Sequence, residues 1–187
     1  MHAQSKVADN GVNVQALLEA REALTSAPQA AQFKWRASCE WINGTHSRSK
    51  VDTFFGLGEE QKHRQTFSYE TDHPEIFASK DVGATPVEVV LAGLAGCLTA
   101  GIANIAAARG INLTEVSSTV EGDIDLLGIF GLSDEVRNGY QQLRASFTLR
   151  GDEPEKLRSV VEQSRRRSAV FDIVTNGVPV SIDVDAG

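Results

Sequence analysis

The sequence predicts an α+β fold, in which antiparallel strands and two longer helices share one hydrophobic core. Three observations lead to this class. Strand-like runs fill residues 33–71, a chargeless stretch covers residues 89–108, and two more strand-like runs occupy residues 111–151. A second helical pattern and a short apolar run follow. Strands that come in blocks, rather than alternating singly with helices, are typical of the α+β class.

The composition favours one soluble domain. The chain has 187 residues, of which 41% are hydrophobic and 23% charged, and this is enough to close one core. The formal net charge of -7 argues against nucleic acid as a partner, because binding phosphate requires a basic surface. Residues 1–15 lack the basic and apolar regions of a secretory signal, so we expect a cytoplasmic protein.

The chain has two cysteines, Cys39 and Cys97. They are too few for a disulfide-stapled scaffold, and no C-x-x-C or Cys/His spacing for zinc occurs. We therefore expect neither a metal nor a cofactor. The two thiols themselves are the candidates for chemistry.

Residues 1–31 are predicted to be an N-terminal extension, and residues 32–187 a single domain. The extension contains a short amphipathic helix that ends before Pro28. Its apolar face carries Val14, Leu17, Leu18 and Leu24.

Alternation and turn signals predict the first three strands. Every second side chain of residues 33–41 is apolar, which is typical of a half-buried strand and makes Cys39 a core residue. The Asn43-Gly44 pair predicts a hairpin turn, with residues 47–56 as its second strand. Residues 62–71 follow as a third strand.

The helix predicted over residues 85–109 begins with a capping box. Thr85 suits the N-cap, Pro86 the first helical position and Glu88 the third. The chargeless stretch that follows is long enough to cross a membrane. However, ten of its residues are Ala or Gly, so we predict a buried central helix and no membrane partner.

A strip of small side chains runs along this helix at steps of no more than four residues. Its members are Gly93, Cys97, Ala100, Gly101, Asn104 and Ala108. Such a strip lets another backbone come close, either the second long helix or the same helix of another subunit. Cys97 then lies in a tight interface, where apolar surroundings make a thiol inert and a nearby cation makes it reactive.

Beyond the central helix, residues 111–125 and 140–151 are predicted to be strands, residues 153–167 a helix and residues 178–184 a last strand. The connection at residues 126–132 carries five large apolar residues where a turn needs none. It is a satellite cluster under the sheet, a pocket wall or a partner surface.

Residues 83–113, "GATPVEVVLAGLAGCLTAGIANIAAARGINL", resemble the cysteine helix of the OsmC/Ohr family, the osmotically inducible and organic hydroperoxide resistance proteins. Residues 156–184 resemble that family's basic helix, second-thiol turn and last strand. The resemblance covers roughly residues 33–185. It implies an intertwined homodimer, in which two β-sheets wrap around paired central helices and a thiol site lies at each end of the subunit interface.

The resemblance also implies an activity, the thiol-dependent reduction of organic hydroperoxides. Cys97 matches the peroxidatic cysteine. Arg48 is the best match to an arginine of the first hairpin that stabilises the thiolate, with Lys50 and Arg36 as alternatives. A glutamate before the helix holds that arginine in the family, and Glu88 is the nearest match.

Two positions depart from the family pattern. In the family peroxidases the glutamate directly follows the proline, but Val87 stands there and Glu88 comes one residue later. In a regular helix Glu88 lies about 13 Å along the axis from Cys97 and on the opposite face. Ser168 stands in place of the second thiol. Because serine forms no disulfide, the resemblance implies an external thiol as reductant.

These features lead to two hypotheses. The first is a one-cysteine organic hydroperoxide reductase that uses Cys97 and Arg48. The second is a non-catalytic protein that binds a small hydrophobic ligand at the dimer interface, in a cleft lined by residues 126–132. A guanidinium within reach of a solvent-accessible Cys97 sulfur favours the enzyme, and a sealed apolar surround favours the binding protein.

Overall fold

The computed structural model describes residues 10–187, and the chain divides into two compact units. One unit comprises residues 13–90, and the other comprises residues 91–187 with the described N-terminal residues 10–12. Residues 1–9 of the predicted extension lie outside the described residues. The predicted domain boundary between residues 31 and 32 stays a prediction.

The 13–90 unit begins with the predicted amphipathic helix, α1 (Val14–Ser26). The side chain of Asn13 caps it by accepting a hydrogen bond from the backbone N–H of Ala16 at 3.0 Å. A 3-10 turn, η1 (Pro28–Ala31), follows. No residue of α1 is fully buried: Val14, Leu17 and Leu24 of its apolar face are half-buried, and Leu18 is exposed.

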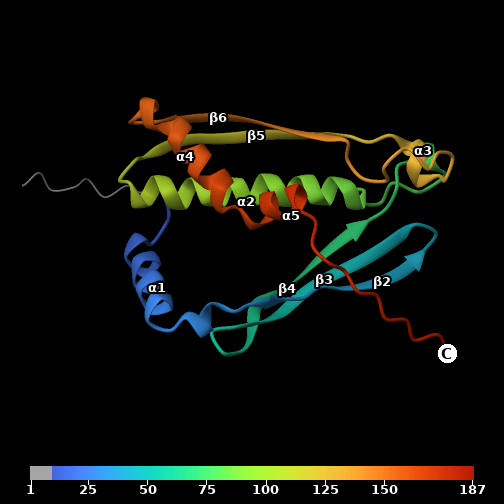
Figure 1. The fold of residues 1–187 in the computed structure, drawn as a ribbon, viewed down its shortest axis with the longest axis horizontal. Coiled ribbons are helices and arrows are strands. Elements are labelled where there is room, and N and C mark those ends of the chain that lie inside the picture. The colour runs from blue at the N-terminus through green and yellow to red at the C-terminus, as the bar shows by residue number, and fades with distance from the viewer. Residues whose placement is uncertain (1–9) are drawn as a thin grey trace, which may run out of the picture. The chain divides into compact units, whose positions relative to one another are not determined.

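An antiparallel sheet forms the rest of this unit (Figure 1). Its central strand β3 pairs with all three others, and the strands are β1 (Lys34–Trp35), β2 (Ser38–Asn43), β3 (His46–Gly56) and β4 (Glu59–Thr71). The predicted hairpin of the first two strands and the predicted third strand are confirmed. The first turn is shifted by one residue, because Asn43 pairs with His46 and the turn consists of Gly44 and Thr45. Gly44 has φ 55°, which favours glycine.

A row of aromatic rings lies on this sheet. Phe33, Trp35 and Phe54 stack with centroids 4.7 to 6.3 Å apart. Every residue of β2 is exposed, and Trp41 on this strand is 74% exposed. The predicted half-buried first strand is therefore wrong for the single chain. The alternation is present, but the chain supplies no cover for the apolar side chains.

The long helix α2 (Pro86–Ala108) starts after a loop that contains the short turn η2 (Glu75–Phe77). Its mean hydropathy reaches 1.9 over 18 residues, so by length and composition it is able to cross a membrane. Only 22% of that window is buried. The helix that was predicted to be buried is thus buried on one face only. Its buried residues are Leu94, Leu98, Ile102, Ile105, Ala106 and Ala107.

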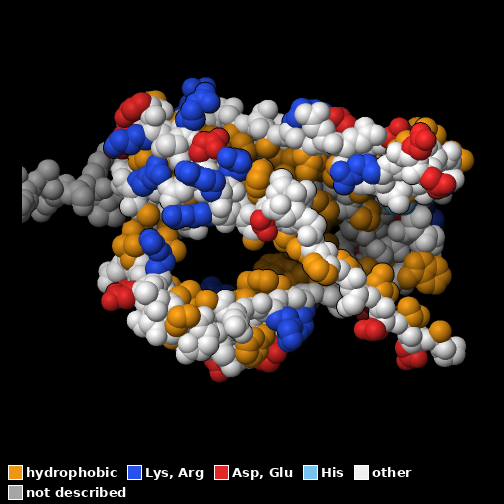
Figure 2. Space-filling view, viewed as in Figure 1, with side chains coloured by type: hydrophobic (Ala, Val, Ile, Leu, Met, Phe, Trp, Pro, Cys, Tyr) orange, Lys and Arg blue, Asp and Glu red, His pale blue; other side chains and the backbone are white. Residues whose placement is uncertain are grey.

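The 91–187 unit contains the main core. An antiparallel pair, β5 (Leu113–Asp123) and β6 (Gln142–Gly151), runs alongside α2, and the helix α4 (Pro154–Arg167) crosses it (Figure 1). These three elements are confirmed predictions. The buried core residues are Ile102, Ile105, Ala106, Ile111, Leu157 and Val160. Lys and Arg side chains gather on the outer side of α4 (Figure 2).

The small-residue strip lets α4 approach α2 closely. A Cβ atom at Gly101 would lie only 2.3 Å from Oγ of Ser164. Ser164 is buried, and its hydroxyl donates a hydrogen bond to the carbonyl of Leu98 at 2.7 Å. Of the two predicted partners for the strip, the second long helix of the same chain is therefore the one that contacts Gly101.

The predicted last strand is wrong. Residues 177–187 form no helix or strand, and Val178, Val180, Ile182 and Val184 are 58 to 82% exposed. A strand needs a neighbouring backbone to pair with, and within residues 10–187 no strand pairs with this segment. The chain instead forms a short helix that the sequence analysis missed, α5 (Ala169–Thr175).

Candidate functional site

Cys97 lies in the middle of α2 and is partly exposed. The hydroxyl of Ser168 donates a hydrogen bond to its sulfur at 3.1 Å. Ser168 itself is buried, at 6% exposure, in the corner between α4 and α5. Ser168, which by resemblance stands at the family's second-thiol position, is therefore in direct contact with the Cys97 thiol.

Ser168 also has a structural role in the chain. Its Oγ accepts the backbone N–H of Phe171 at 3.1 Å and thereby caps α5. The close packing of Gly101 against Ser164 sets the distance between α2 and the end of α4, and Ser168 follows one turn later. One hydroxyl thus fixes the α4–α5 corner and places a polar donor at the Cys97 sulfur.

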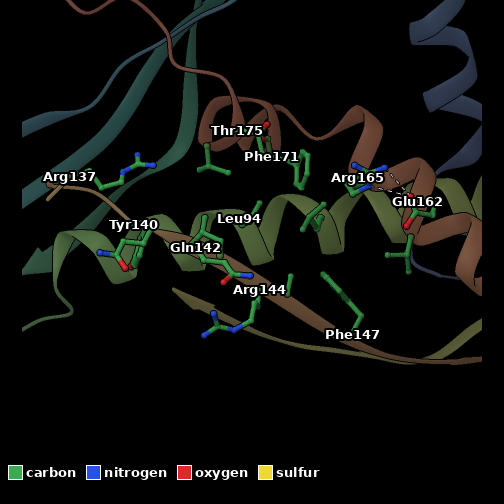
Figure 3. Close-up of a pocket in the computed structure, with 16 residues that line it drawn as sticks. Leu94, Arg137, Tyr140, Gln142, Arg144, Phe147, Glu162, Arg165, Phe171 and Thr175 are labelled. Atoms are coloured by element: carbon green, nitrogen blue, oxygen red, sulfur yellow. Dashed lines mark hydrogen bonds and ion pairs between the residues drawn. The ribbon is translucent and has the colours of Figure 1, made fainter. Parts of the chain in front are cut away.

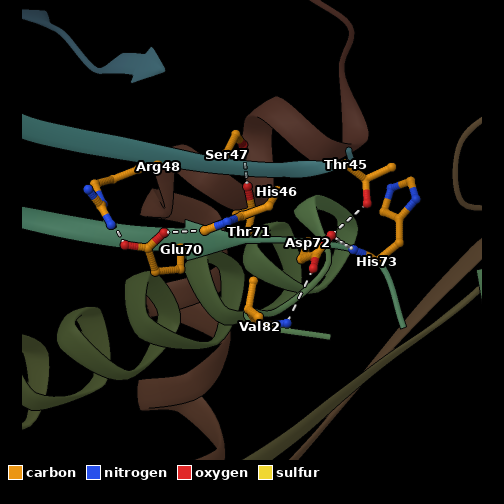
Figure 4. A network of polar contacts seen from close by, with 9 residues as sticks. All are labelled: Thr45, His46, Ser47, Arg48, Glu70, Thr71, Asp72, His73 and Val82. Atoms are coloured by element: carbon orange, nitrogen blue, oxygen red, sulfur yellow. Dashed lines mark hydrogen bonds and ion pairs between the residues drawn. The ribbon is translucent and has the colours of Figure 1, made fainter. Parts of the chain in front are cut away.

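The second predicted residue, Arg48, lies on β3 in the other unit. Its Nε donates to Glu70 on β4 at 2.6 Å, and the other oxygen of Glu70 contacts Nε2 of His46 at 2.6 Å (Figure 4). The hydrogen bonds from Arg48 and His46 lower the pKa of the Glu70 carboxyl. Glu70 thus holds the Arg48 guanidinium in one orientation, and the sequence analysis did not identify it.

The alternatives to Arg48 are bound differently. Both terminal nitrogens of Arg36 donate hydrogen bonds to Glu60, at 2.6 and 2.7 Å, so its guanidinium is already paired. Lys50 lies 3.7 Å from a Glu40 oxygen. Arg48 is held through Nε alone, and among the described residues no acceptor lies within hydrogen-bond distance of its terminal nitrogens. Arg48 and Lys50 thus keep donors that make no hydrogen bond within the described residues, and of the two only Arg48 offers a planar pair of terminal nitrogens.

Glu88 forms the predicted capping box. Its carboxylate accepts from the backbone N–H of Thr85 at 2.8 Å and from the Thr85 hydroxyl at 2.9 Å. The Thr85 hydroxyl in turn accepts the N–H of Glu88 at 3.4 Å. This geometry gives Glu88 a structural role at the start of α2. The arginine-holding contact that the family pattern assigns to a glutamate before the helix is made here by Glu70.

Cys39 is exposed, so the prediction that it is a core residue is wrong. Every residue of β2 is exposed, on both faces of the strand. The Ser49 hydroxyl, and to a lesser extent that of Ser47, lowers the pKa of the Cys39 thiol, against the smaller opposing effects of desolvation and of Glu40. The second thiol of the chain is therefore an exposed group with enhanced acidity.

A polar network closes the end of the sheet next to His46. Asp72 is 1% exposed and accepts hydrogen bonds from the Thr45 hydroxyl at 2.6 Å and from the backbone N–H groups of His73 and Val82 at 2.9 and 3.3 Å (Figure 4). These donors lower the Asp72 pKa to about 2, the Thr45 hydroxyl having the largest effect. The network fastens the loop that leads into α2.

A cavity of about 600 Å³ lies within the 91–187 unit, between α2, β6, α4 and α5 (Figure 3). Its apolar lining includes Leu94, Leu98, Leu143, Phe147, Val161 and Phe171. Three arginines also line it, Arg137, Arg144 and Arg165. Leu94 and Leu98 flank Cys97 on α2, and Phe171 is the residue whose N–H Ser168 accepts, so the cavity adjoins the thiol site.

The apolar connection contains a short helix, α3 (Leu126–Ile129), and its large side chains are 37 to 71% exposed. They are not a satellite cluster under the sheet. No residue of 126–132 lines the cavity, so the predicted pocket wall is also wrong for this site. Among the described residues, no group of three or more His, Cys, Asp or Glu side chains is arranged to hold a metal ion.

These features define an α+β protein with a partly exposed thiol on a long apolar helix and a hydroxyl donor at its sulfur. The sequence model of the OsmC-like protein family matches residues 78–183. The match spans more than half of the chain, and the chain belongs to this family.

Solved structures agree on the fold. The chain is similar to an OsmC-like protein from Mycoplasma pneumoniae, with a TM-score of 0.59 and 14% identity over 77% of this chain and 89% of that one. It is also similar to an OsmC-like protein of unknown function from Vibrio cholerae, with a TM-score of 0.52 and 11% identity over 74% and 92%. A comparison with curated protein sequences gives no match. The predicted fold class is confirmed.

Proposed function

We propose that this chain reduces organic hydroperoxides with Cys97 as the nucleophile and an external thiol as the reductant. The thiolate sulfur of Cys97 attacks the terminal oxygen of R–O–O–H, and the O–O bond breaks. The leaving alkoxide takes up a proton and departs as the alcohol R–OH. Cys97 is oxidised to a sulfenic acid.

The external thiol R′–SH closes the cycle in two steps. Its sulfur attacks the sulfenic sulfur, water leaves, and a mixed disulfide forms. A second R′–SH then releases the Cys97 thiol and R′–S–S–R′. The balance is one hydroperoxide and two thiols consumed, with one alcohol, one water and one disulfide formed.

The observation that carries this proposal is the 3.1 Å hydrogen bond from Ser168 to the sulfur of Cys97. A polar donor thus lies at the sulfur itself, and the partial exposure of Cys97 leaves a path for the peroxide. Both features oppose the alternative of an inert packing residue in a sealed apolar surround. Membership of the OsmC-like family agrees with the assignment.

Arg48 is the cation that we assign to the Cys97 thiolate, because Glu70 holds it and its terminal nitrogens are not engaged. We propose that a homodimer completes the site. Two exposed surfaces support this: the aromatic row on the sheet, and the small-residue side of α2 that carries Gly93, Gly96, Ala100 and Asn104. We further propose a cytoplasmic protein with no nucleic-acid or membrane partner.

The second candidate function is a non-catalytic protein that binds a small hydrophobic ligand. The cavity of about 600 Å³ favours it, since this volume is typical of small-molecule sites, which span roughly 300–1,000 Å³. Its apolar wall comes from α2, β6, α4 and α5. Residues 126–132 do not line this cavity, so in this alternative their remaining role is that of a surface for a partner.

One experiment separates the two functions. The purified protein is mixed with one equivalent of cumene hydroperoxide and a sulfenic-acid trap, and its intact mass is measured beside Cys97→Ser and Cys39→Ser. Fast oxidation that is lost only in Cys97→Ser supports the peroxidase. The Cys39→Ser control is needed because Cys39 is exposed and acidic. A folded protein whose Cys97 stays reduced over minutes overturns the peroxidase proposal.

The assembly is tested by light scattering and sedimentation without detergent. The proposed homodimer predicts twice the mass of the 187-residue chain. A monomer, or a protein that stays dispersed only in detergent, contradicts the proposed use of the uncovered face of α2.

A further inference from the structure

We propose that the cavity of the 91–187 unit binds a long-chain carboxylate, with the carboxylate group at Arg137 and the alkyl chain along the apolar wall (Figure 3). This inference rests on the second candidate function, ligand binding in the same cavity, and it requires no chemistry at Cys97. It names the class of that ligand.

The first argument is the division of the lining into an apolar and a cationic part. Arg137 and Tyr140 lie at one end of the cavity, and Phe147 and Phe171 lie toward the other, where Arg165 and Glu162 pair with each other (Figure 3). Leu94 is buried to 3% exposure and forms part of the wall. A ligand that matches this lining has one polar end and an extended apolar body, since burial of each methylene adds to its affinity.

The second argument is the charge of the lining. Two of its three arginines are already neutralised. Arg144 makes a bidentate contact with Asp123, which includes a bond of 2.9 Å to Oδ1. Arg165 lies 3.1 Å from an oxygen of Glu162, and its guanidinium lies over the ring of Phe171 at 5.4 Å.

Arg137 differs from both. Among residues 10–187, no carboxylate lies within ion-pair distance of its guanidinium. It is exposed and lies in the loop that precedes β6, at the solvent-facing edge of the cavity lining. A planar guanidinium with free donors binds a carboxylate through two parallel hydrogen bonds. The cavity therefore offers one uncompensated cation at its mouth, which matches a single negative charge.

Other ligand classes fit less well. A cationic amphiphile is repelled by the arginines, and a neutral apolar molecule leaves Arg137 without a counter-ion. A dianion finds only one free guanidinium, since those of Arg144 and Arg165 are paired. A long-chain monocarboxylate matches both parts of the cavity: its carboxylate matches Arg137, and its alkyl chain matches the apolar wall.

The probe for this site is dodecanoate, titrated calorimetrically into the full chain at submillimolar concentration. Neutral 1-dodecanol and cationic dodecyltrimethylammonium have the same alkyl chain and serve as matched ligands. We expect one dodecanoate bound per chain, weaker binding of dodecanol, and no binding of the cation. Arg137→Gln is expected to weaken dodecanoate about tenfold or more and to leave dodecanol unchanged.

Arg150→Gln is the matched control variant. Arg150 lies on β6, is 70% exposed, is paired with Glu115, and does not line the cavity, so its loss changes the net charge but not the site. Arg137→Lys keeps the positive charge but not the planar guanidinium. It is expected to bind dodecanoate more tightly than Arg137→Gln but more weakly than the wild type. Equal weakening in Arg137→Gln and Arg150→Gln, or no dodecanoate binding by the folded wild-type chain, overturns the proposal.

The same titration with Cys97→Ser separates this inference from the proposed reaction. Binding that is unchanged in Cys97→Ser leaves the carboxylate site intact whether or not the wild-type protein reduces cumene hydroperoxide. If Cys97→Ser loses dodecanoate binding while Ser168→Ala keeps it, binding depends on the thiol itself. This outcome contradicts a carboxylate site that is independent of Cys97.

Discussion

The Ser168 hydroxyl lies 3.1 Å from the sulfur of Cys97 and donates a hydrogen bond to it. This contact joins two residues that are 71 positions apart in the sequence. It brings the end of α4 against the middle of α2, and the absence of a side chain at Gly101 makes that approach possible. The corner that carries the second thiol in the family pattern is thus kept, with oxygen in place of sulfur.

This contact predicts that a cysteine at position 168 will form a disulfide with Cys97. Side-chain atoms already in contact need little movement to reach the sulfur–sulfur bond length of about 2.05 Å. Oxidation of Ser168→Cys should therefore remove two hydrogen atoms from the intact mass and link the two peptides in a non-reducing digest. Ala169→Cys, in which the thiol is placed one residue later on an exposed position, is the control.

A disulfide in Ala169→Cys but not in Ser168→Cys would contradict the assigned geometry. A sulfenic acid that persists in Ser168→Cys after peroxide treatment would show that the two side chains do not approach each other in solution.

A second prediction concerns Glu70, which binds Arg48, and Glu88, which the resemblance assigned to that role. Glu70→Gln should slow peroxide reduction by about tenfold or more, because a misplaced Arg48 no longer stabilises the thiolate. Glu88→Ala should leave the rate close to that of the wild type and lower helix stability by about 0.3–1.5 kcal/mol, as expected for a lost capping box. Rates and thermal midpoints are measured for both.

The pH profile of the rate discriminates a positioning role from a merely structural one for Glu70. A change in the profile for Glu70→Gln, with an unchanged thermal midpoint, fits the positioning of Arg48. The opposite pattern, in which Glu88→Ala slows the reaction and Glu70→Gln does not, would return the arginine-holding role to Glu88.

Local patterns predicted most of the elements. The capping box and the chargeless run defined α2 almost to its ends, and alternation defined β5 and β6. The α5 helix was missed because "SAVFD" is short and was interpreted as a turn. A serine cap with an acidic residue in the first turn, Asp172, was the available signal.

Glu70 was beyond the reach of local patterns. Gly56 pairs with Glu59 at the turn between β3 and β4, and a regular ladder from there would place Phe67 opposite Arg48. An irregularity between Val51 and Thr53 shifts the register, so Glu70 lies opposite Arg48 instead. The length of a bulge is set by tertiary packing. The covering of the sheet was likewise unpredictable, because alternation shows which face is apolar but not what covers it.

A third prediction follows from the acidity of Cys39. Its lowered pKa means that more thiolate is present at a pH below the ordinary thiol value of 9.0, so iodoacetamide should alkylate Cys39 faster than a free cysteine near neutral pH. Ser49→Ala should raise this pKa and slow the alkylation, because it removes the largest stabilising contribution. The rate is followed by mass in a Cys97→Ser background.

Ser38→Ala is the control for Cys39, because neighbouring residues on a strand point to opposite faces. Equal alkylation rates in the Ser49 and Ser38 variants would refute the assigned cause. Protection of Cys39 in the wild-type protein at high concentration, released on dilution, would indicate that the sheet face is covered by a second copy.

A fourth prediction concerns Asp72, whose pKa is lowered from 3.8 to about 2. A carboxyl with a lowered folded-state pKa stabilises the fold above its unfolded-state value, and this contribution is lost as the pH falls from about 4 toward 2. Asp72→Asn should therefore lower the urea midpoint clearly at pH 6. The amide places its own N–H groups against backbone donors such as that of Val82.

The difference in urea midpoint between Asp72→Asn and the wild type should shrink at pH 3 and below. Asp134→Asn, an exposed position, controls for the change in net charge. A difference that is constant between pH 6 and pH 3 would mean that the Asp72 contacts act through packing rather than through the ionised carboxylate.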